Sequence, residues 1–309
     1  MLIRKREVIS IKKDKKMSDM QNKSVKVGFQ QIMIGGICKN YEKALAVLKA
    51  AKSAGYDYIE LNDFMVQKSP FIVKLLTKLG GMPVGNCGAL DWHKLVEESG
   101  LKVSAMHSNL GAIEADPKAV AELAKSYGTT TVVITGMYRF DYSDYEAVTK
   151  LADRLNAAGK ALKDEGVSLL YHNHNVELQK VTDSECAYDF IIANTDSEYV
   201  NFEFDSYWFT DGGADVADYM ERLGSRMQMW HINDRGVRNK GPFMTPILKE
   251  DAMELGYGNM NLSKYAKLAK ENGIEAVVLE THKNWVDNDP VKSIQMSAEF
   301  LKKTFKKSS

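Results

Sequence analysis

One unit recurs along most of this chain and constrains its fold more than any other feature. The unit is an amphipathic helical pattern, then a glycine, then a short apolar run that ends in polar residues. Gly55, Gly100, Gly128, Gly166 and Gly273 each stand between a helical pattern and the apolar run that follows it. Glycine is the usual residue at the left-handed end of a helix, and alternating helices and strands indicate a parallel sheet.

The apolar runs from Val25 onward amount to eight expected strands. They cover residues 25–34, 56–63, 101–109, 129–136, 167–174, 199–205, 227–234 and 274–282. Helical patterns cover residues 41–53, 117–127, 144–165, 214–223, 262–272 and 290–303. This alternation predicts a single-domain α/β protein, a (β/α)8 TIM barrel over residues 25–305. No GxGxxG motif follows the first strand and no P-loop is present, which disfavours an open nucleotide-binding sheet.

The first 24 residues differ in composition from the rest of the chain. They are rich in lysine, almost free of aromatic residues and without sustained periodicity, so we expect residues 1–24 to form a flexible basic leader. Over the whole chain, 41 basic residues balance 41 acidic ones. A net charge of zero argues against nucleic acid or an anionic membrane as the main partner.

The chain shows no apolar stretch of membrane-spanning length and no secretory signal. Cys38, Cys87 and Cys186 lie far apart in the sequence and match no zinc or disulfide pattern. We therefore expect a soluble cytoplasmic protein with free thiols. Two long segments, 64–92 and 235–261, follow expected strands and would lie on the upper face of the barrel as lids, substrate walls or subunit contacts.

The chain has six histidines, and all but His93 stand at the exit of an expected strand. These five are His107, His172, His174, His231 and His282. Carboxylates occur at the same level, namely Glu60, Glu177, Glu203, Asp205, Asp234 and Glu280. Because every barrel strand delivers its C-terminal residues to one mouth, we expect a shared site there. Mixed oxygen and imidazole ligands suit Mn²⁺, Mg²⁺, Co²⁺ or Zn²⁺.

Alternation of side chains along a strand narrows the choice of metal ligands. The predicted ligands are Glu177, Asp205, His231 and Glu280. His172 is the alternative to Glu177, because Leu170, His172 and His174 point the same way along their strand. Glu177 also has the ordinary interpretation of a surface residue in a loop.

Five further residues are predicted to contact substrate. Trp208 would offer an apolar platform for a sugar ring, or else belong to the core. Arg235 and Lys283 follow ligand strands and would hold hydroxyl groups. Glu60 ends the second strand, where a ligand-binding role and a helix-cap role are equally open, and His282 follows the last strand.

Several motifs together resemble a known group of enzymes. A YHNH run followed by a carboxylate, a FEFD strand with a nearby tryptophan, a WHIND strand and a final LETH strand are similar to the xylose isomerase-like barrels called sugar phosphate isomerases/epimerases. The likeness covers residues 25–301. Within that superfamily, YHNHNVEL, FEFDSYWFTDGG, RMQMWHINDRG, MPVGN and ELGYGNMNL resemble the large (α) subunit of bacterial C-glycoside deglycosidases.

This resemblance implies a catalytic barrel that pairs with a small β subunit and uses a divalent metal, Mn²⁺ first among the candidates. The implied reaction cleaves the C–C bond between a 3-oxo-sugar and an aglycone such as a flavonoid. The family's metal set maps onto Glu177, Asp205, His231 and Glu280, and its general base onto His174 or His172. Related isomerases carry a glutamate where His172 stands, so the first ligand remains open between His172 and Glu177.

The implied mechanism begins with loss of the C2 proton of a 3-oxo-sugar and continues with expulsion of the group on C1. His107 or His282 would act as the acid that protonates the leaving group. The alternatives are a keto-sugar isomerase, an epimerase or a 3-keto-O-glycoside lyase, all of which share the first step. A metal-dependent endonuclease is disfavoured by the neutral charge, and an inactive binding scaffold by the number of ionisable strand ends.

Overall fold

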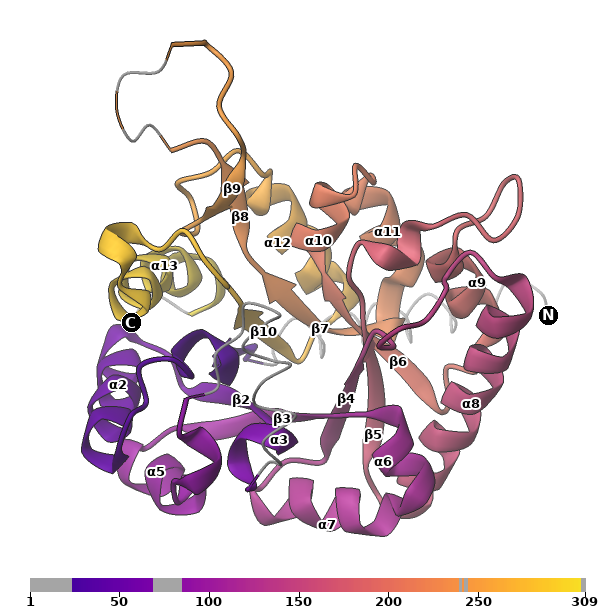
Figure 1. Ribbon diagram of the computed structural model, residues 1–309, viewed down its shortest axis with the longest axis horizontal. Helices are drawn as coiled ribbons and strands as arrows, with labels where there is room; N and C mark the ends of the chain where they lie inside the picture. The colour runs from indigo at the N-terminus through magenta and orange to yellow at the C-terminus, as the bar shows by residue number, and fades with distance from the viewer. Residues whose placement is uncertain (1–23, 69–84, 239–240, 242–243, 307–309) are drawn as a thin grey trace, which may run out of the picture.

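The computed structural model describes residues 24–68, 85–238, 241 and 244–306. The expected leader lies outside these residues except for Ser24. Within the described part, eight parallel strands close into a barrel in the order β1-β10-β7-β6-β5-β4-β3-β2, and helices surround them (Figure 1). The predicted single (β/α)8 barrel is confirmed.

The barrel strands are short and contribute their central residues to the interior. Their bounds are β1 (Lys26–Gln30), β2 (Tyr58–Asn62), β3 (Lys102–Ser108), β4 (Thr131–Thr135), β5 (Ser168–His172), β6 (Val200–Asp205), β7 (Met227–Ile232) and β10 (Ala276–Leu279). Pairing is in register between most neighbours, but shifts occur between Ile59 and Leu61 of β2 and between Phe202 and Glu203 of β6. Both shifts lie beside strand residues that point toward the mouth.

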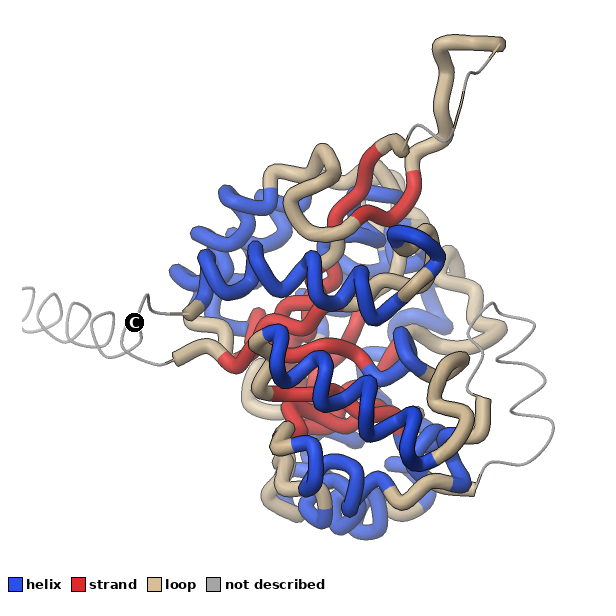
Figure 2. The backbone as a smooth tube through the Cα atoms, turned by 90° about the vertical axis from the view of Figure 1, so that its left-hand side faces the viewer, coloured by secondary structure: helices blue, strands red, loops and turns tan. Residues whose placement is uncertain are grey.

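The helices cover the outside of the barrel, as the side view shows (Figure 2). Their bounds are α2 (Tyr41–Ala54), α3 (Asp63–Val66), α5 (Trp92–Ser99), α6 (Leu110–Ala115), α7 (Pro117–Ser126), α8 (Tyr145–Asp164), α9 (Ala187–Asn194), α10 (Ser206–Asp211), α11 (Val216–Leu223), α12 (Leu262–Asn272) and α13 (Pro290–Phe305). Short 3₁₀ turns cover Gln31–Ile34, Cys87–Ala89, Val176–Leu178, Gly224–Arg226 and Val286–Asn288.

Local sequence explains where the long helices begin and how closely they pack. Asp144 and Asp289 cap α8 and α13, each accepting a hydrogen bond from the main chain of the first turn. Within α8, a side chain at Gly159 would collide with the main-chain carbonyl of Tyr199. The glycine therefore lets α8 approach the start of β6 closely.

The barrel interior consists of an apolar layer below and an ionisable layer above. The apolar layer is made of Ala105, Val133, Leu170, Met229, Ala276 and Val278. Two residues further along the chain from Ala105, Leu170, Met229 and Val278 stand His107, His172, His231 and Glu280, all buried. The apolar layer closes the interior from below, so the ionisable groups can meet water or a ligand only from the mouth.

Most predicted strands end earlier than their apolar runs, and two of these ends show how the chain leaves the sheet. The run predicted at residues 25–34 leaves the sheet after Gln30, because the Gln30 side chain accepts a 2.7 Å hydrogen bond from the Ile32 main chain and begins a 3₁₀ turn. The run at 227–234 ends at Ile232, and β8 (Asp234–Gly236) then pairs antiparallel with β9 (Asp251–Met253). This hairpin projects from the barrel (Figure 2).

Of the two long segments expected on the upper face, 235–261 contains most of the β8–β9 hairpin, with residues 239–240 and 242–243 outside the described part. The other, 64–92, contains most of α3 and the turn at Cys87–Ala89, with residues 69–84 outside the described part. Cys38, Cys87 and Cys186 are free, as predicted, and all three are buried. Among the described residues, no helix is both long and apolar enough to cross a membrane.

Candidate metal centre

Five of the strands end in buried ionisable residues that meet at the mouth of the barrel. His107 stands in β3, His172 ends β5, Asp205 ends β6, His231 stands in β7, and Glu280 directly follows β10. None of these side chains is more than 8% exposed. Glu280 keeps its place beside β7 because its main-chain N–H donates a 3.2 Å hydrogen bond to the Ile232 carbonyl.

Two overlapping groups of these residues are arranged as metal ligands would be. In each group the ligand atoms lie within 4.8 Å of one another. The upper group is His172, Asp205, His231 and Glu280, and the lower group is Glu60, His107, Glu203 and His231. His231 belongs to both, because one ring nitrogen faces Glu280 and the other faces Glu60.

The Asn173 side chain, directly after β5, fixes the position of Asp205 at the end of β6. The Asn173 side chain accepts a 2.9 Å hydrogen bond from the Asp205 N–H and donates a 3.0 Å hydrogen bond to the Asp205 carbonyl. One carboxylate oxygen of Asp205 accepts a 3.0 Å hydrogen bond from the Trp208 N–H at the start of α10. The second oxygen of Asp205 is therefore the one available to a ligand.

Three of the four predicted ligands, Asp205, His231 and Glu280, lie together in the structure, and Glu177 lies apart from them. Glu177 is fully buried in the turn after β5 and belongs to neither group. His172, the alternative, stands in the upper group. The ordinary interpretation of Glu177 as an exposed loop residue is wrong, because its side chain is 0% exposed.

Glu177 instead organises the loop that carries His174. Its carboxylate accepts 2.9 Å hydrogen bonds from the Tyr171 hydroxyl and from the His174 main chain. Tyr171 lies 2.9 Å from the Tyr142 hydroxyl, which accepts a hydrogen bond from the Met137 main chain. Gly136 makes this arrangement possible, since a Cβ there would lie 2.7 Å from Glu177 Oε1.

Three rings line the side of the mouth next to the upper group. The His174 ring lies 5.0 Å from the His172 ring and 5.7 Å from the Trp208 ring. Trp208 in turn lies 6.1 Å from His282. His174, Trp208 and His282 are each partly exposed. These rings form a wall beside the upper group that a sugar ring can contact.

The other predicted contact residues lie in two places. Arg235 is paired with Asp211 at 3.0 Å and with Glu250, and the Lys283 ammonium lies 3.2 Å from Asp251. Both cations are therefore engaged on the β8–β9 side of the mouth. Glu60, by contrast, is 0% exposed and lies in the lower group, beneath the upper one.

Burial and close charges displace the pKa values of these groups in opposite directions. Burial and the nearby His172 lower the pKa of His174 to about 3, so its imidazole is neutral at pH 7. Burial alone would lower the pKa of His107, but Glu60 and Glu203 raise it to about 10. Burial raises the pKa of Asp205 to about 6.

The donor set suits a divalent cation. Four buried carboxylates, Glu60, Glu203, Asp205 and Glu280, face three buried imidazoles, His107, His172 and His231. Even with all three imidazoles protonated the layer keeps excess negative charge, which is costly in a buried place. Glu60 Oε1 and Glu203 Oε1 are also buried without a hydrogen-bond partner. Oxygen and imidazole ligands fit Mg²⁺, Mn²⁺ or Zn²⁺.

Sequence reasoning missed several residues that hold this site. The sequence places Glu203 among the strand-end carboxylates but indicates no role for it, and no pattern points to Tyr171, Tyr142 or Gly136. Asn173 stands between two histidines of the YHNH motif, so its position was a usable signal. No sequence signal links the Tyr142 and Tyr171 hydroxyls, because the two residues are 29 positions apart in the chain.

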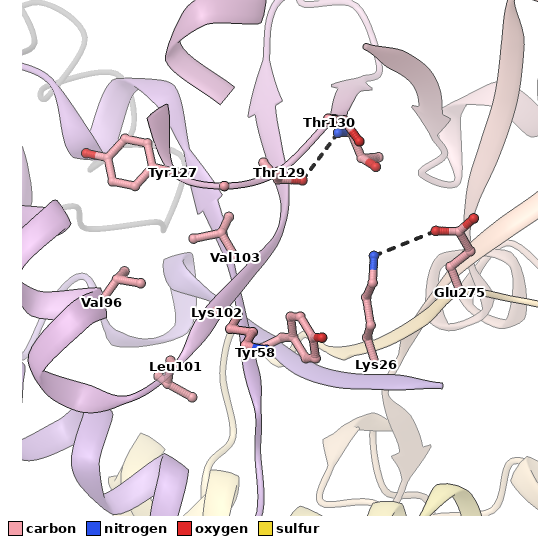
Figure 3. Close-up of a pocket in the computed structure, with 12 residues that line it drawn as sticks. Lys26, Tyr58, Val96, Leu101, Lys102, Val103, Tyr127, Thr129, Thr130 and Glu275 are labelled. Atoms are coloured by element: carbon pink, nitrogen blue, oxygen red, sulfur yellow. Dashed lines mark hydrogen bonds and ion pairs between the residues drawn. The ribbon is translucent and has the colours of Figure 1, made fainter. Parts of the chain in front are cut away.

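A separate hollow lies at the opposite end of the barrel (Figure 3). It encloses about 440 Å³ beside the first residues of several strands, among them Lys26, Lys102 and Thr131. None of the predicted site residues lines it. Since barrel enzymes place their chemistry at the C-terminal strand ends, this hollow is not the candidate site.

Solved structures share the fold of this chain. A sugar phosphate isomerase/epimerase from Parabacteroides distasonis superposes with a TM-score of 0.68 at 21% identity, covering 91% of this chain and 94% of that one. A xylose isomerase-like barrel from Mycobacterium smegmatis, in complex with magnesium, gives a TM-score of 0.63 at 14% identity, covering 93% and 98%. At these identities the likeness concerns the fold.

Curated relatives match over part of their length. An inosose dehydratase of Mesomycoplasma hyopneumoniae is 33% identical over 94 residues, which are 30% of each chain. An inosose dehydratase of Clostridium perfringens is 24% identical over 156 residues, or 48% of this chain and 50% of the relative. The chain thus matches half or less of these relatives' length. The model of the xylose isomerase-like TIM barrel family matches residues 48–304. The chain therefore belongs to the xylose isomerase-like TIM barrel family.

Proposed function

We propose that this protein is a metal-dependent lyase that removes the proton next to the carbonyl of a cyclic oxidised sugar and expels the substituent on the following carbon. The observation that carries the proposal is the upper group of His172, Asp205, His231 and Glu280 beside an imidazole that is not part of it, His174. The four converging side chains can bind a cation, and the separate imidazole can accept a proton.

A divalent ion held by the upper group would act as a Lewis acid for the negative charge that develops on the substrate carbonyl oxygen. His172, Asp205, His231 and Glu280 would hold that ion. Their deep burial excludes water from the site, which strengthens electrostatic stabilisation of the developing charge.

His174 is the proposed general base. Its main chain is anchored to Glu177 by a 2.9 Å hydrogen bond, and its ring lies beside Trp208, so substrate stacked on the tryptophan meets the imidazole. The imidazole takes the C2 proton of a 3-oxo-sugar. As the C1=C2 double bond forms, the bond from C1 to its substituent breaks and the electron pair leaves with that substituent.

The leaving group needs a proton, and His282 is placed to supply it. Its ring lies 6.1 Å from Trp208, and its Nε2 lies 3.6 Å from Glu280 Oε1. Glu280 raises the pKa of His282 against the effect of burial, which favours the protonated form that an acid needs. His107, the other predicted acid, lies deeper among Glu60 and Glu203 and is 5% exposed.

Two leaving groups are supported by different observations. The motifs YHNHNVEL and FEFDSYWFTDGG favour a carbon-linked aglycone, as in a C-glycoside deglycosidase α subunit that works with a small β subunit and Mn²⁺. The matches to inosose dehydratases favour water, lost from a keto-cyclitol. Isomerisation or epimerisation would share the first proton transfer, and would return the proton to the neighbouring carbon or to the opposite face of the same carbon.

One product analysis separates these functions. The protein, with Mn²⁺, Mg²⁺ or Zn²⁺ and with or without a small subunit that co-purifies, is incubated with a 3-oxo-C-glycoside, a 3-oxo-O-glycoside, an inosose and a free keto-sugar. Mass spectrometry and proton NMR then identify the products. Release of aglycone or loss of water supports the lyase, while products of unchanged mass with altered stereochemistry would replace it with an epimerase or isomerase.

A further inference from the structure

The lower group lies directly beneath the upper one and contacts both of its imidazoles. It consists of Glu60 in β2, His107 in β3 and Glu203 in β6, together with the shared His231. Glu60 and Glu203 are fully buried. A substrate in the mouth would meet the upper group first, so the lower group acts on the site through its neighbours.

Each imidazole of the upper group contacts a lower carboxylate, and His231 contacts both of them, because its Nε2 also lies 3.2 Å from Glu203 Oε1. His231 Nε2 lies 2.6 Å from Glu60 Oε2, while its Nδ1 lies 3.1 Å from Glu280 Oε2. His172 Nδ1 lies 3.1 Å from Glu203 Oε2, which leaves its Nε2 for the upper group. In both rings one nitrogen is held from below and the other remains for an ion.

We propose that Glu60 and Glu203, cross-linked by His107, form a buried outer layer that orients the His231 and His172 rings and increases their affinity for a metal. The proposal rests on the metal site of the proposed function. A carboxylate that accepts the second N–H of a ligating histidine fixes its tautomer and makes the other nitrogen more basic. Glu60, His107 and Glu203 are thus positioning residues.

His107 supports the layer by holding the two carboxylates together. Its Nε2 lies 2.9 Å from Glu60 Oε2 and 3.2 Å from Glu203 Oε2. The His107 ring therefore lies between the two carboxylates and limits their rotation.

The same lower group could alternatively hold a second ion, and one distance argues against this. Ligand atoms that share an ion at about 2.0–2.2 Å stand roughly 3 Å or more apart. The 2.6 Å between His231 Nε2 and Glu60 Oε2 is instead the length of a strong charge-assisted hydrogen bond. The lower group is therefore better described as hydrogen-bonded support.

The test measures binding of Zn²⁺ alone to the full chain, stripped of metal and titrated in competition with a chromophoric chelator. The variants are Glu60→Gln, Glu203→Gln and His107→Gln. Glu254→Gln is the matched control, because Glu254 is a buried carboxylate outside both groups that accepts hydrogen bonds from Arg238 and the Val286 main chain. Thermal unfolding of each stripped variant checks that it is folded.

The wild type and the control are expected to bind one ion per chain with the same Kd. Glu60→Gln and Glu203→Gln should each raise that Kd about 10- to 100-fold, and His107→Gln should raise it less. With Co²⁺ in place of Zn²⁺, the visible absorption of the two carboxylate variants should shift, which a purely structural role would not produce.

A wild-type Kd in folded Glu60→Gln overturns the proposal for His231. A wild-type Kd in folded Glu203→Gln overturns it for His172. Two ions per chain in the wild type, falling to one in Glu60→Gln, would make the lower group a second metal site. Asp205→Asn distinguishes this failure from a failure of the proposed function. If the upper group did not bind the ion at all, Asp205→Asn would leave the Kd of the single ion unchanged.

Discussion

Charged side chains are exposed to solvent at the lower end of the barrel and buried at its mouth. At the lower end, Lys26 and Glu275 form a 3.6 Å ion pair in which both side chains remain partly exposed, next to the hollow of Figure 3. At the mouth, Glu203 and His231 are fully buried. Exposed pairs keep their hydration and contribute little to stability, whereas buried charges lose it and need strong partners.

This difference indicates which end carries chemistry. Near the lower end, the buried Thr129 hydroxyl has a local partner, because it donates a 2.9 Å hydrogen bond to the Ser104 carbonyl. At the mouth, buried oxygens of Glu60 and Glu203 have no hydrogen-bond partner. Glu203 Oε1 does lie 3.2 Å from His231 Nε2, and a cation bound by the neighbouring upper group would further offset the negative charge of both carboxylates.

The largest expected effect comes from removing a carboxylate of the upper group. Glu280→Gln should lower metal affinity about 100-fold or more, because a neutral amide is a much weaker ligand for a divalent cation than a carboxylate. Metal analysis after gel filtration measures the loss. A metal content equal to that of the wild type would remove Glu280 from the ligand set.

The next largest effect separates proton transfer from metal binding. His174→Gln should reduce turnover about 10²- to 10⁴-fold, the usual contribution of a general base, while metal content stays near that of the wild type. Steady-state kinetics and metal analysis on the same preparation make the comparison. Unimpaired turnover would show that another group takes the proton, with His172 the first to examine.

A third substitution decides between the two candidates for the first ligand. Glu177→Gln should retain the metal, because the structure places His172 in the upper group. It should cost about 1–3 kcal/mol of unfolding free energy, since the buried carboxylate accepts hydrogen bonds from Tyr171 and the His174 main chain. Urea unfolding and metal analysis test both statements, and a loss of metal with the fold intact would restore Glu177 as a ligand.

The smallest effect is expected at the lower end. Asp57 is partly buried, which would raise its pKa, but hydrogen bonds from Lys306 and Lys52 lower it. A lowered carboxyl pKa contributes stability above the unfolded-state value and loses it as the pH falls through the folded-state value. Asp57→Asn should therefore cost less than about 1 kcal/mol at pH 7 and nothing in strong acid. A larger loss of unfolding free energy in urea would show that exposed ion pairs at the lower end contribute more to stability than expected.

The fold was predictable because its signals are local. A glycine ends α2, α5 and α12 in the left-handed conformation, and each time a strand begins within the next few residues. Helix α9 escaped prediction because AYDFIIAN is apolar on most of its faces and shows little helical periodicity.

The site was predictable only in part, because it depends on where strands end and how they pair. Alternation along β5 holds as far as His172, where the strand stops, so it could not place Glu177 in the turn beyond. The depths of Glu60 and Glu203 depend on the register shifts beside them in β2 and β6. Such shifts leave no pattern in the sequence, and the lower group was therefore missed.

Exchange of substrate protons with solvent measures directly whether His174 and a cation in the upper group remove a proton next to a carbonyl. The 3-oxo-glycosides, the inosose and the keto-sugar are each incubated in D₂O with metal-loaded protein and followed by proton NMR. With at least one of them, the signal next to the carbonyl should fade with wild type, and remain with His174→Gln or after chelation. Equal exchange with and without metal, or none with any of these compounds while metal is bound, would contradict the account.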